Sequence, residues 1–235
     1  MKILVQTSFF LFLFFLTTKK SFAQNLKWNN YNLELVNTKS EILNIDGSSV
    51  LKLERDLLKS PFDINNIEST VDGPTFAKII DIEMINGVIE LKVLSKIIEN
   101  SPFPNARGFV GVGFRVDEKN HFDAIYLRPS NGRVDDQLRR NHTVQYFSYP
   151  GYTFSRLRRE ANGVYETYAD IGLDEWIDVK IEIQDKKAKL HLNNQQTPTF
   201  IVNDMLGTSK SGKVALWVEI GTIAFFKDLK ITPAK

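Results

Sequence analysis

The stretch WIDVKIEI (Trp176–Ile183) alternates apolar and polar residues without interruption. Such alternation places every second side chain on the same face of a β-strand, so Ile177, Val179, Ile181 and Ile183 are expected to point into the core. The segments AKLHLNN, KVALWVEI and IAFFKDLKIT follow at similar spacing, and no segment has the pattern of a long helix. We therefore predict an all-β protein in which antiparallel strands form a two-sheet β-sandwich.

Upstream, KIIDIEMINGVIELKVLS (residues 78–95) predicts two strands joined at Asn86-Gly87, because this dipeptide favours the positive φ angles of a tight hairpin turn. Counting back from the turn gives the pairs Met84 with Ile89, Ile82 with Leu91, and Ile80 with Val93. Glu83 and Glu90 would then be neighbours on the opposite face. Like charges so placed are unfavourable unless they share a proton or a cation, and we favour the alternative of a solvated sheet face.

A second hairpin is predicted from RGFVGVGFRVDEKNHFDAIYLR (residues 107–128), with its turn at residues 117–120. One face is expected to carry Gly111 opposite Tyr126, Gly113 opposite Ala124, and the arginines Arg115 and Arg128. Glycine inside a strand often marks the close approach of another group. This face therefore suits a sugar ring stacked on Tyr126, unless the glycines relieve sheet curvature and Tyr126 itself fills the space.

The last third of the chain carries the features of a known fold family. These features are Trp176 at the start of a strand, an Asn193-Asn194 turn, Gly212 before VALWV, and Phe225-Phe226 with Asp228-Leu229 in the final strand. Together they resemble the closing strands of concanavalin A-like lectin/glucanase jelly rolls, in particular the laminin-G-like and 3-keto-disaccharide-hydrolase-like domains of secreted bacterial proteins. The resemblance covers residues 75–232, and it implies a jelly roll without fixing an activity, since this fold hosts lectins, glycosidases, lyases and adhesion modules.

The first 23 residues have the parts of a secretory signal peptide: Lys2, an apolar run that ends at Leu16, and the small-residue cleavage site Ser21-Phe22-Ala23. The apolar run is too short for a comfortable membrane span, and Lys19-Lys20 interrupt its far end. We predict cleavage after Ala23, one mature domain over residues 24–235, and a secreted or periplasmic bacterial protein without a membrane span.

Composition limits the partners and cofactors. The chain has 30 basic and 28 acidic residues, and because the predicted signal peptide holds three of the lysines, the mature chain keeps 27 basic residues against 28 acidic ones. This balance argues against nucleic acid as a partner. With no cysteine and three histidines, the chain is expected to hold no disulfide and no zinc, and we predict no metal and no cofactor. A calcium ion bound by oxygen atoms is left open.

The candidate site lies in RPSNGRVDDQLRRNHTVQYFSYPGYTFSRLRRE (residues 128–160), which gathers seven arginines among tyrosines and phenylalanines. The planar guanidinium group donates two parallel hydrogen bonds to a carboxylate, sulfate or phosphate. The segment follows the strand of Tyr126 and is expected to rim the same face. The candidate substrate-binding residues are Arg115, Tyr126, Arg128, Arg139, Arg140, Gln145, Arg156 and Arg158. Nearby acids offer the alternative that these arginines form a structural ion-pair network.

Catalytic motifs are sparse. The E-x-D-x-x-E strand of laminarinase-type enzymes does not occur in the sequence, which disfavours their retaining chemistry. His142 and Tyr146 are the catalytic candidates, because a polysaccharide lyase needs arginines beside a uronate carboxylate and a His or Tyr that takes the C5 proton. His121 and His191 are expected to be ordinary strand residues.

We therefore predict a carbohydrate-recognising jelly-roll domain whose ligand is an acidic or otherwise decorated glycan. The alternative is a carbohydrate-active enzyme on the same fold, either a glycoside hydrolase or a polysaccharide lyase. A second alternative is a structural accessory domain without a small ligand.

Overall fold

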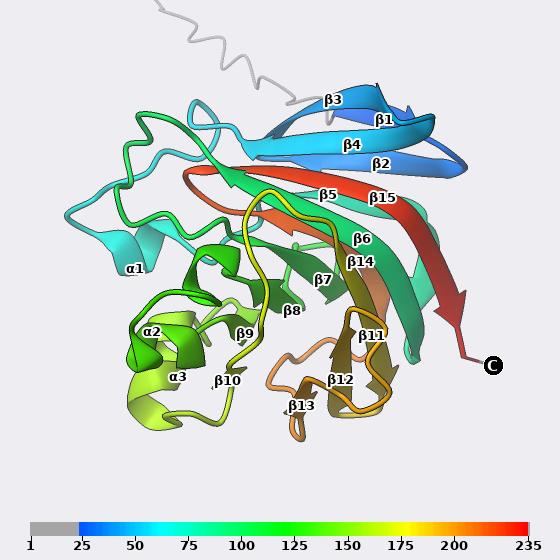
Figure 1. Cartoon of the computed structure of the whole chain (residues 1–235). Coiled ribbons are helices and arrows are strands. Elements are labelled where there is room, and N and C mark those ends of the chain that lie inside the picture. Colours follow the sequence, from blue (N-terminus) through cyan, green and yellow to red (C-terminus); the bar gives the residue numbers. More distant parts are fainter. Residues whose placement is uncertain (1–23, 235) are drawn as a thin grey trace, which may run out of the picture.

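A computed structural model describes residues 24–234 of the protein, and the predicted signal peptide lies outside these residues. The chain forms two antiparallel sheets packed face to face, which confirms the predicted β-sandwich (Figure 1). The eight-stranded sheet is called the front sheet here because it carries the pocket described below, and it lies behind the other sheet in Figure 1. Its order is β1 (Gln24–Trp28), β2 (Tyr31–Val36), β5 (Phe76–Met84), β14 (Gly212–Val218), β7 (Val110–Val116), β8 (Phe122–Leu127), β9 (Val144–Tyr149) and β10 (Glu166–Thr167).

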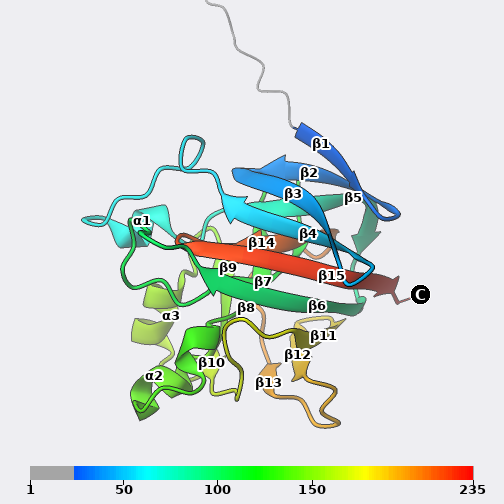
Figure 2. The same ribbon diagram turned by 45° about the horizontal axis from the view of Figure 1, so that its top comes forward.

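The back sheet has seven strands, in the order β13 (Phe200–Val202), β12 (Lys187–Leu192), β11 (Ile177–Gln184), β6 (Gly87–Ile97), β15 (Thr222–Pro233), β4 (Ser48–Arg55) and β3 (Thr38–Ile45). The helical elements are short, namely α1 (Ile67–Thr70), the 3-10 turn η1 (Pro129–Asn131), α2 (Gln137–Asn141) and α3 (Phe154–Glu160). None of the helices within residues 24–234 has the length and hydrophobicity needed to cross a lipid bilayer. Figure 2 shows the three α-helices gathered at one end of the sandwich.

The core lies between the sheets and follows the alternation seen in the sequence. Ile177, Val179, Ile181 and Ile183 of β11 are all buried, as predicted. Apolar residues of the front sheet, such as Val110 and Ile125, meet β11 and β12 residues around a small void between the sheets. Burial of this kind contributes about 25 cal/mol for each Å² of apolar surface removed from water, so it is the main stabilising term of the sandwich.

The second predicted hairpin is confirmed. β7 and β8 pair in the expected register, with Gly111 opposite Tyr126 and Gly113 opposite Ala124. A Cβ atom built on Gly111 would lie 2.5 Å from the Cβ of Tyr126. Glycine is therefore required at position 111 because the side chain of Tyr126 occupies that space, so the glycine does not leave an open floor for a ligand.

The first predicted hairpin is wrong. β5 belongs to the front sheet and β6 to the back sheet, so the two strands do not pair. Of the two turn residues only Gly87 has a positive φ, and the Asn86 side chain accepts a hydrogen bond from the Asp185 backbone N–H at 2.8 Å. A tight type I′ turn needs positive φ at both positions. The segment instead crosses from one sheet to the other.

The predicted neighbours in that hairpin are separated as a result. Met84 pairs with Gly212, and a bulge in the β5–β14 pairing brings Ile79 into the core, while Ile80 is only partly buried. Glu83 and Glu90 are not cross-strand neighbours. Each lies near a lysine, Glu83 at 3.8 Å from Lys213 and Glu90 at 3.3 Å from Lys230. Both glutamates belong to exposed, ion-paired sheet faces, as the favoured alternative expected.

Candidate functional site

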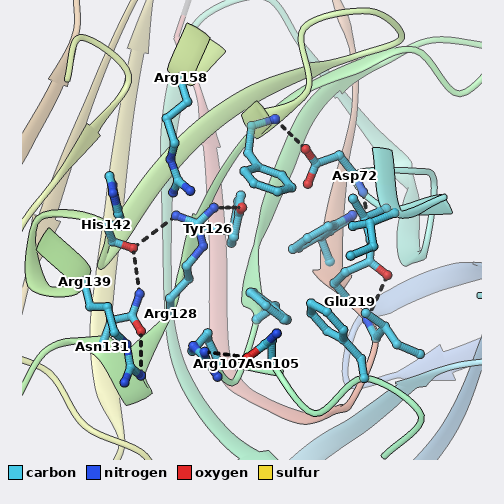
Figure 3. Close-up of a pocket in the computed structure, with 17 residues that line it drawn as sticks. Asp72, Asn105, Arg107, Tyr126, Arg128, Asn131, Arg139, His142, Arg158 and Glu219 are labelled. Carbon is cyan, nitrogen blue, oxygen red and sulfur yellow. Dashed lines mark hydrogen bonds between the residues drawn. The ribbon is translucent and has the colours of Figure 1, made fainter. Parts of the chain in front are cut away.

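A pocket of about 220 Å³ opens at one end of the front sheet, where β8 and β14 end and β5 and β7 begin. Its floor comes from the face of the front sheet that is turned away from the back sheet. Its walls come from three segments that are distant in the sequence: the loop of α1, the loop that precedes β7, and the 128–160 segment with α2 and α3. Figure 3 shows the side chains of these segments converging around Tyr126 and Arg128.

The floor of the pocket is aromatic. Tyr126 is 2% exposed, and its ring centroid lies 5.0 Å from that of Trp217 and 6.2 Å from that of Phe109. Phe103 and Phe154 line the pocket beside them. Aromatic rings offer flat apolar surface for stacking, and the pairs also stabilise one another by about 0.5–1.5 kcal/mol each. The base of the pocket is therefore apolar, and because Tyr126 and Trp217 are buried, the ring surface that a ligand can reach belongs mainly to Phe103 and Phe154.

Arg128 lies buried over this floor, only 4% exposed. Its guanidinium carbon is 4.7 Å from the centre of the Tyr126 ring, and its nitrogens donate to the Tyr126 hydroxyl, to the His142 carbonyl at 3.0 Å and to Gln145 Oε1 at 3.4 Å. All of these acceptors are neutral. Within residues 24–234 no carboxylate oxygen lies within ion-pair distance of this guanidinium group. A buried charge normally has an opposite charge beside it, so Arg128, which lacks a direct ion pair although its charge lowers the pKa of nearby Asp72, is available to bind an anion.

Two further arginines, both partly buried, likewise have neutral partners. Arg107 donates to Asn105 Oδ1 at 3.1 Å, and Arg139 donates to Asn131 Oδ1 at 3.3 Å. In the part of the chain that the structure describes, neither guanidinium group has a carboxylate partner, and Nε of Arg139 is buried without any hydrogen-bond partner. Burial lowers the pKa of Arg107, and the like charges of Arg139 and Arg128 lower it further. The three arginines, which we call the arginine triad, concentrate positive charge on one side of the pocket.

Two carboxylates, Asp72 and Glu219, lie on the opposite side (Figure 3). Glu219 forms a buried ion pair with Arg55 and accepts a hydrogen bond from the Asp72 backbone N–H at 2.9 Å. Burial raises the pKa of Glu219, and Arg55 opposes this rise. Glu219 thus lies in a closed network that fixes the Asp72 backbone.

Asp72 itself is unusual. It is 2% exposed and has φ +57, a left-handed conformation that few residues other than glycine adopt. Oδ2 accepts a hydrogen bond from the Phe154 N–H at 2.6 Å, and Oδ1 accepts none from the described residues. Burial raises the pKa of Asp72 to about 7, the Phe154 N–H lowers it, and the nearby Glu219 charge raises it. Asp72 therefore carries a proton for much of the time near neutral pH, and it faces the pocket.

His142 follows α2 and lines the wall opposite Asp72. Its Nδ1 lies 2.6 Å from Glu166 Oε2, and the same carboxylate accepts hydrogen bonds from Arg158, from Nη2 at 2.9 Å and from Nε at 3.1 Å. Burial lowers the pKa of His142, as does Arg158, whereas Glu166 raises it. The imidazole is thus neutral at neutral pH and able to accept a proton.

The structure brings five of the ten predicted site residues to the pocket: Tyr126, Arg128, Arg139, His142 and Arg158. The other four candidate binding residues have structural partners elsewhere. Arg115 donates to the backbone carbonyls of Ile85 and Asp185, Arg140 to the Tyr168 hydroxyl, Gln145 to the carbonyls of Tyr146 and Tyr165, and Arg156 to Glu160 and the Gly151 carbonyl.

Tyr146 is not brought near His142. Its side chain points between the two sheets, where it is fully buried, and its hydroxyl donates to Asp123 and accepts from the Leu206 N–H at 2.6 Å. The strand alternation of β9 explains this placement, because Tyr146 and the pocket-side residue Gln145 have opposite orientations. The lyase pair of His142 with Tyr146 therefore does not form.

The alternative of an ion-pair network applies to four of the seven arginines in the 128–160 segment. Arg133 pairs with Asp170 and Glu175, Arg156 with Glu160, Arg158 with Glu166, and Arg159 with Glu68. Most of these pairs are exposed and contribute about 0–1 kcal/mol each. Arg128 and Arg139 differ from them because they line the pocket and have no acidic partner among the described residues.

Sequence reasoning missed Asp72, Glu219, Arg107, Asn105, Asn131 and Trp217, all of which line the pocket. They come from segments outside the arginine-rich stretch and show no shared spacing in the sequence. Within residues 24–234 no group of three or more His, Asp or Glu side chains has the arrangement of a metal site.

Comparison with known proteins identifies the fold. No family model matches the chain, and no curated protein matches it in sequence. Among solved structures, the carbohydrate-binding module CBM66 from Bacillus subtilis superposes with a TM-score of 0.51 at 13% identity, over 84% of this chain and 96% of that one. A putative glycosyl hydrolase from Parabacteroides distasonis gives a TM-score of 0.46 at 14% identity, over 85% of this chain and 89% of the other.

The β-glucanase of Bacillus licheniformis gives a TM-score of 0.42 at 12% identity and covers 91% of this chain and 98% of its own. At 13% identity the likeness to CBM66 concerns the fold alone, and it agrees with the two antiparallel sheets described above. The chain has a jelly-roll β-sandwich fold, as the sequence predicted.

Proposed function

We propose that this protein binds a carbohydrate that carries an anionic group, with the arginine triad around the carboxylate or sulfate and the aromatic floor beneath the sugar ring. The observation that carries the proposal is Arg128, a buried guanidinium group with only neutral acceptors. An incoming anion would supply the missing charge. The fold that the chain shares with CBM66 supports a carbohydrate rather than another anionic ligand.

The pocket has the features that small-molecule sites usually show, namely an apolar base and a few convergent polar groups. Asn105 and Asn131 add amide groups for hydroxyls next to Arg107 and Arg139. Charge-assisted hydrogen bonds to a buried anion contribute about 1.5–3 kcal/mol each. Loss of one arginine from the triad is therefore expected to weaken binding by about 10- to 100-fold.

The experiment measures binding of glucuronic acid, galacturonic acid and their neutral counterparts glucose and galactose by titration calorimetry. We expect the acids to bind and the neutral sugars to bind more weakly. Arg139→Gln should weaken binding of the acids and flatten its dependence on salt, since exposed charges are screened over about 8–10 Å at physiological ionic strength. Arg156→Gln is the matched control, because this arginine of the same segment pairs with Glu160 and lies outside the pocket. Equal binding of acidic and neutral sugars would refute the role of the anionic group. Absence of binding by all four sugars would refute the proposal as a whole and favour an accessory structural domain.

Asp72 favours a second candidate function, which is cleavage of the bound sugar. A protonated carboxyl in an apolar setting is the form that a general acid needs. In this reaction Asp72 would donate its proton to the glycosidic oxygen as that oxygen leaves the anomeric carbon. A water molecule would add to the same carbon, and neutral His142 on the opposite wall would accept its proton.

The test for cleavage is the release of reducing ends from oligosaccharides of the acid that binds. Asp72→Asn should abolish release and retain binding, whereas Asp46→Asn, an exposed aspartate that also has a positive φ (+50), should leave release unchanged. A lyase would instead give an unsaturated product that is lost in His142→Ala. Binding without any product would rule out both reactions and leave the recognition function.

We also propose that the protein is exported from a bacterial cell to the periplasm or the medium. The support is the signal-peptide pattern of residues 1–23. N-terminal sequencing of the exported protein should begin at Gln24. Intact Met1 in a membrane fraction would contradict this proposal.

A further inference from the structure

A second hollow of about 390 Å³ adjoins the pocket on the far side of His142. It lies between α2 and the turn that leads into β10, and it is open to solvent. Its lining includes Leu138, Asn141, Asn162, Thr167 and Tyr168. His142 lines both the pocket and this hollow, so this residue lies at the boundary between them.

The wall between the two spaces is held in place by charge. Arg158 lines the pocket, Glu166 lines the second hollow, and the two side chains are joined by hydrogen bonds of 2.9 and 3.1 Å. His142 contacts the same carboxylate at 2.6 Å. Because Glu166 is 8% exposed and already has two partners, it serves to fix His142 in position rather than to bind a ligand.

The chemistry of the second hollow differs from that of the pocket. Apart from His142 and Glu166, which are engaged with each other, its polar side chains are amides and hydroxyls, which bind sugar hydroxyls as both donors and acceptors. The nearby cation is Arg140, which donates to the Tyr168 hydroxyl at 2.7 Å and stacks over the Tyr168 ring at 4.6 Å. Arg140 is thus engaged with Tyr168. Leu138, which is 68% exposed, adds apolar surface at the rim. This hollow suits an uncharged, hydroxyl-bearing ring.

We infer that the pocket and the second hollow are adjacent subsites for one oligosaccharide, with the anionic unit at the arginine triad and an uncharged sugar unit beyond His142. The inference rests on the proposed function and deepens it by naming the substrate class. The ligand is a heteroglycan in which acidic and neutral units are linked, because the arginine triad lines the first subsite, whereas the residues that line the second one include no lysine or arginine. His142 lies at the junction, beside the bond that joins the two units.

The experiment compares glucuronic acid with disaccharides of glucuronic acid and glucose, linked in both orders, by titration calorimetry. We expect one disaccharide to bind at least about fivefold more tightly than glucuronic acid. The double variant Asn162→Ala/Thr167→Ala should reduce the ratio of the two affinities to about one. Asn203→Ala, an exposed asparagine outside both subsites, is the matched control and should keep the ratio.

Arg139→Gln separates this inference from the proposed function, because it should lower both affinities and preserve their ratio. Binding of glucuronic acid with no gain from either disaccharide would overturn the second subsite and leave the first one standing. A gain that survives in the double variant would likewise overturn it. Absence of binding by all three sugars would refute both the proposed function and this inference.

Discussion

Replacement of Asp72 by Asn tests the unusual state of this residue. The side chain of Asn has almost the same shape, its Oδ1 is able to accept the hydrogen bond that the Phe154 N–H now donates at 2.6 Å, and Asn tolerates the φ of +57. Unlike Asp, Asn cannot ionise. The variant therefore changes one property of the buried site, its response to pH, with little change in packing.

The size of the effect follows from the shifted pKa of Asp72. Burial raises this pKa from 3.8 to about 7, so between these values the folded protein binds more protons at position 72 than the unfolded chain does. Stability therefore falls as pH rises through this window. The stabilising contribution of Asp72 is complete below the unfolded pKa of 3.8 and is lost as pH rises to the folded pKa of about 7. Between pH 5 and pH 8 the folded wild type should lose about 2–3 kcal/mol that Asp72→Asn does not lose. Glu219 also has a raised pKa and interacts with Asp72, so the comparison measures the titration of Asp72 together with its coupling to Glu219.

The assay is urea denaturation followed by tryptophan fluorescence, at several values from pH 5 to pH 8, with Asp46→Asn as control. Asp46 also has a positive φ but lies exposed in a turn, so its variant should keep the wild-type slope. The reasoning fails if wild type and Asp72→Asn show the same dependence of unfolding free energy on pH. It fails equally if the dependence of Asp72→Asn is steeper.

Three further substitutions test the fold and the sorting of the arginines. Ile181→Ala removes a buried β11 side chain and should lower the free energy of unfolding by about 2–5 kcal/mol in chemical denaturation. Lys180→Ala, on the outer face of the same strand, should change it by no more than about 0.5 kcal/mol. Equal losses would contradict the assigned faces. Gly111→Ala places a methyl group against Tyr126 and should lower the unfolding free energy by about 1–3 kcal/mol, so an unchanged melting temperature would contradict the close packing. Arg140→Gln should lower the melting temperature and leave the affinity for glucuronic acid unchanged, and weaker binding of that acid would place Arg140 in the first subsite.

The sequence alone determined the all-β class, the buried face of β11 and the register of the β7–β8 hairpin. Alternation at period two is a local property of a strand, so Ile181 is buried and Lys180 exposed whichever strands lie beside them. The pairing of Gly111 with Tyr126 was also predictable, because a short turn makes the two strands neighbours and fixes their register. The resemblance of the closing strands to concanavalin A-like jelly rolls predicted the correct fold, because the resemblance rests on the order and spacing of strands along the chain.

Only the tertiary structure decided which strands pair across longer distances and which side chains meet. The pattern around Asn86-Gly87 fits a hairpin and a crossover between sheets equally well, and the partners β14 and β15 of the two strands settled the outcome. The roles of the arginines depended likewise on acids brought near by folding. Arg158 meets Glu166, whereas Arg128 is buried with neutral acceptors. The raised pKa of Asp72 arises from burial, a property that residues distant in the sequence create together when the sheets and loops pack.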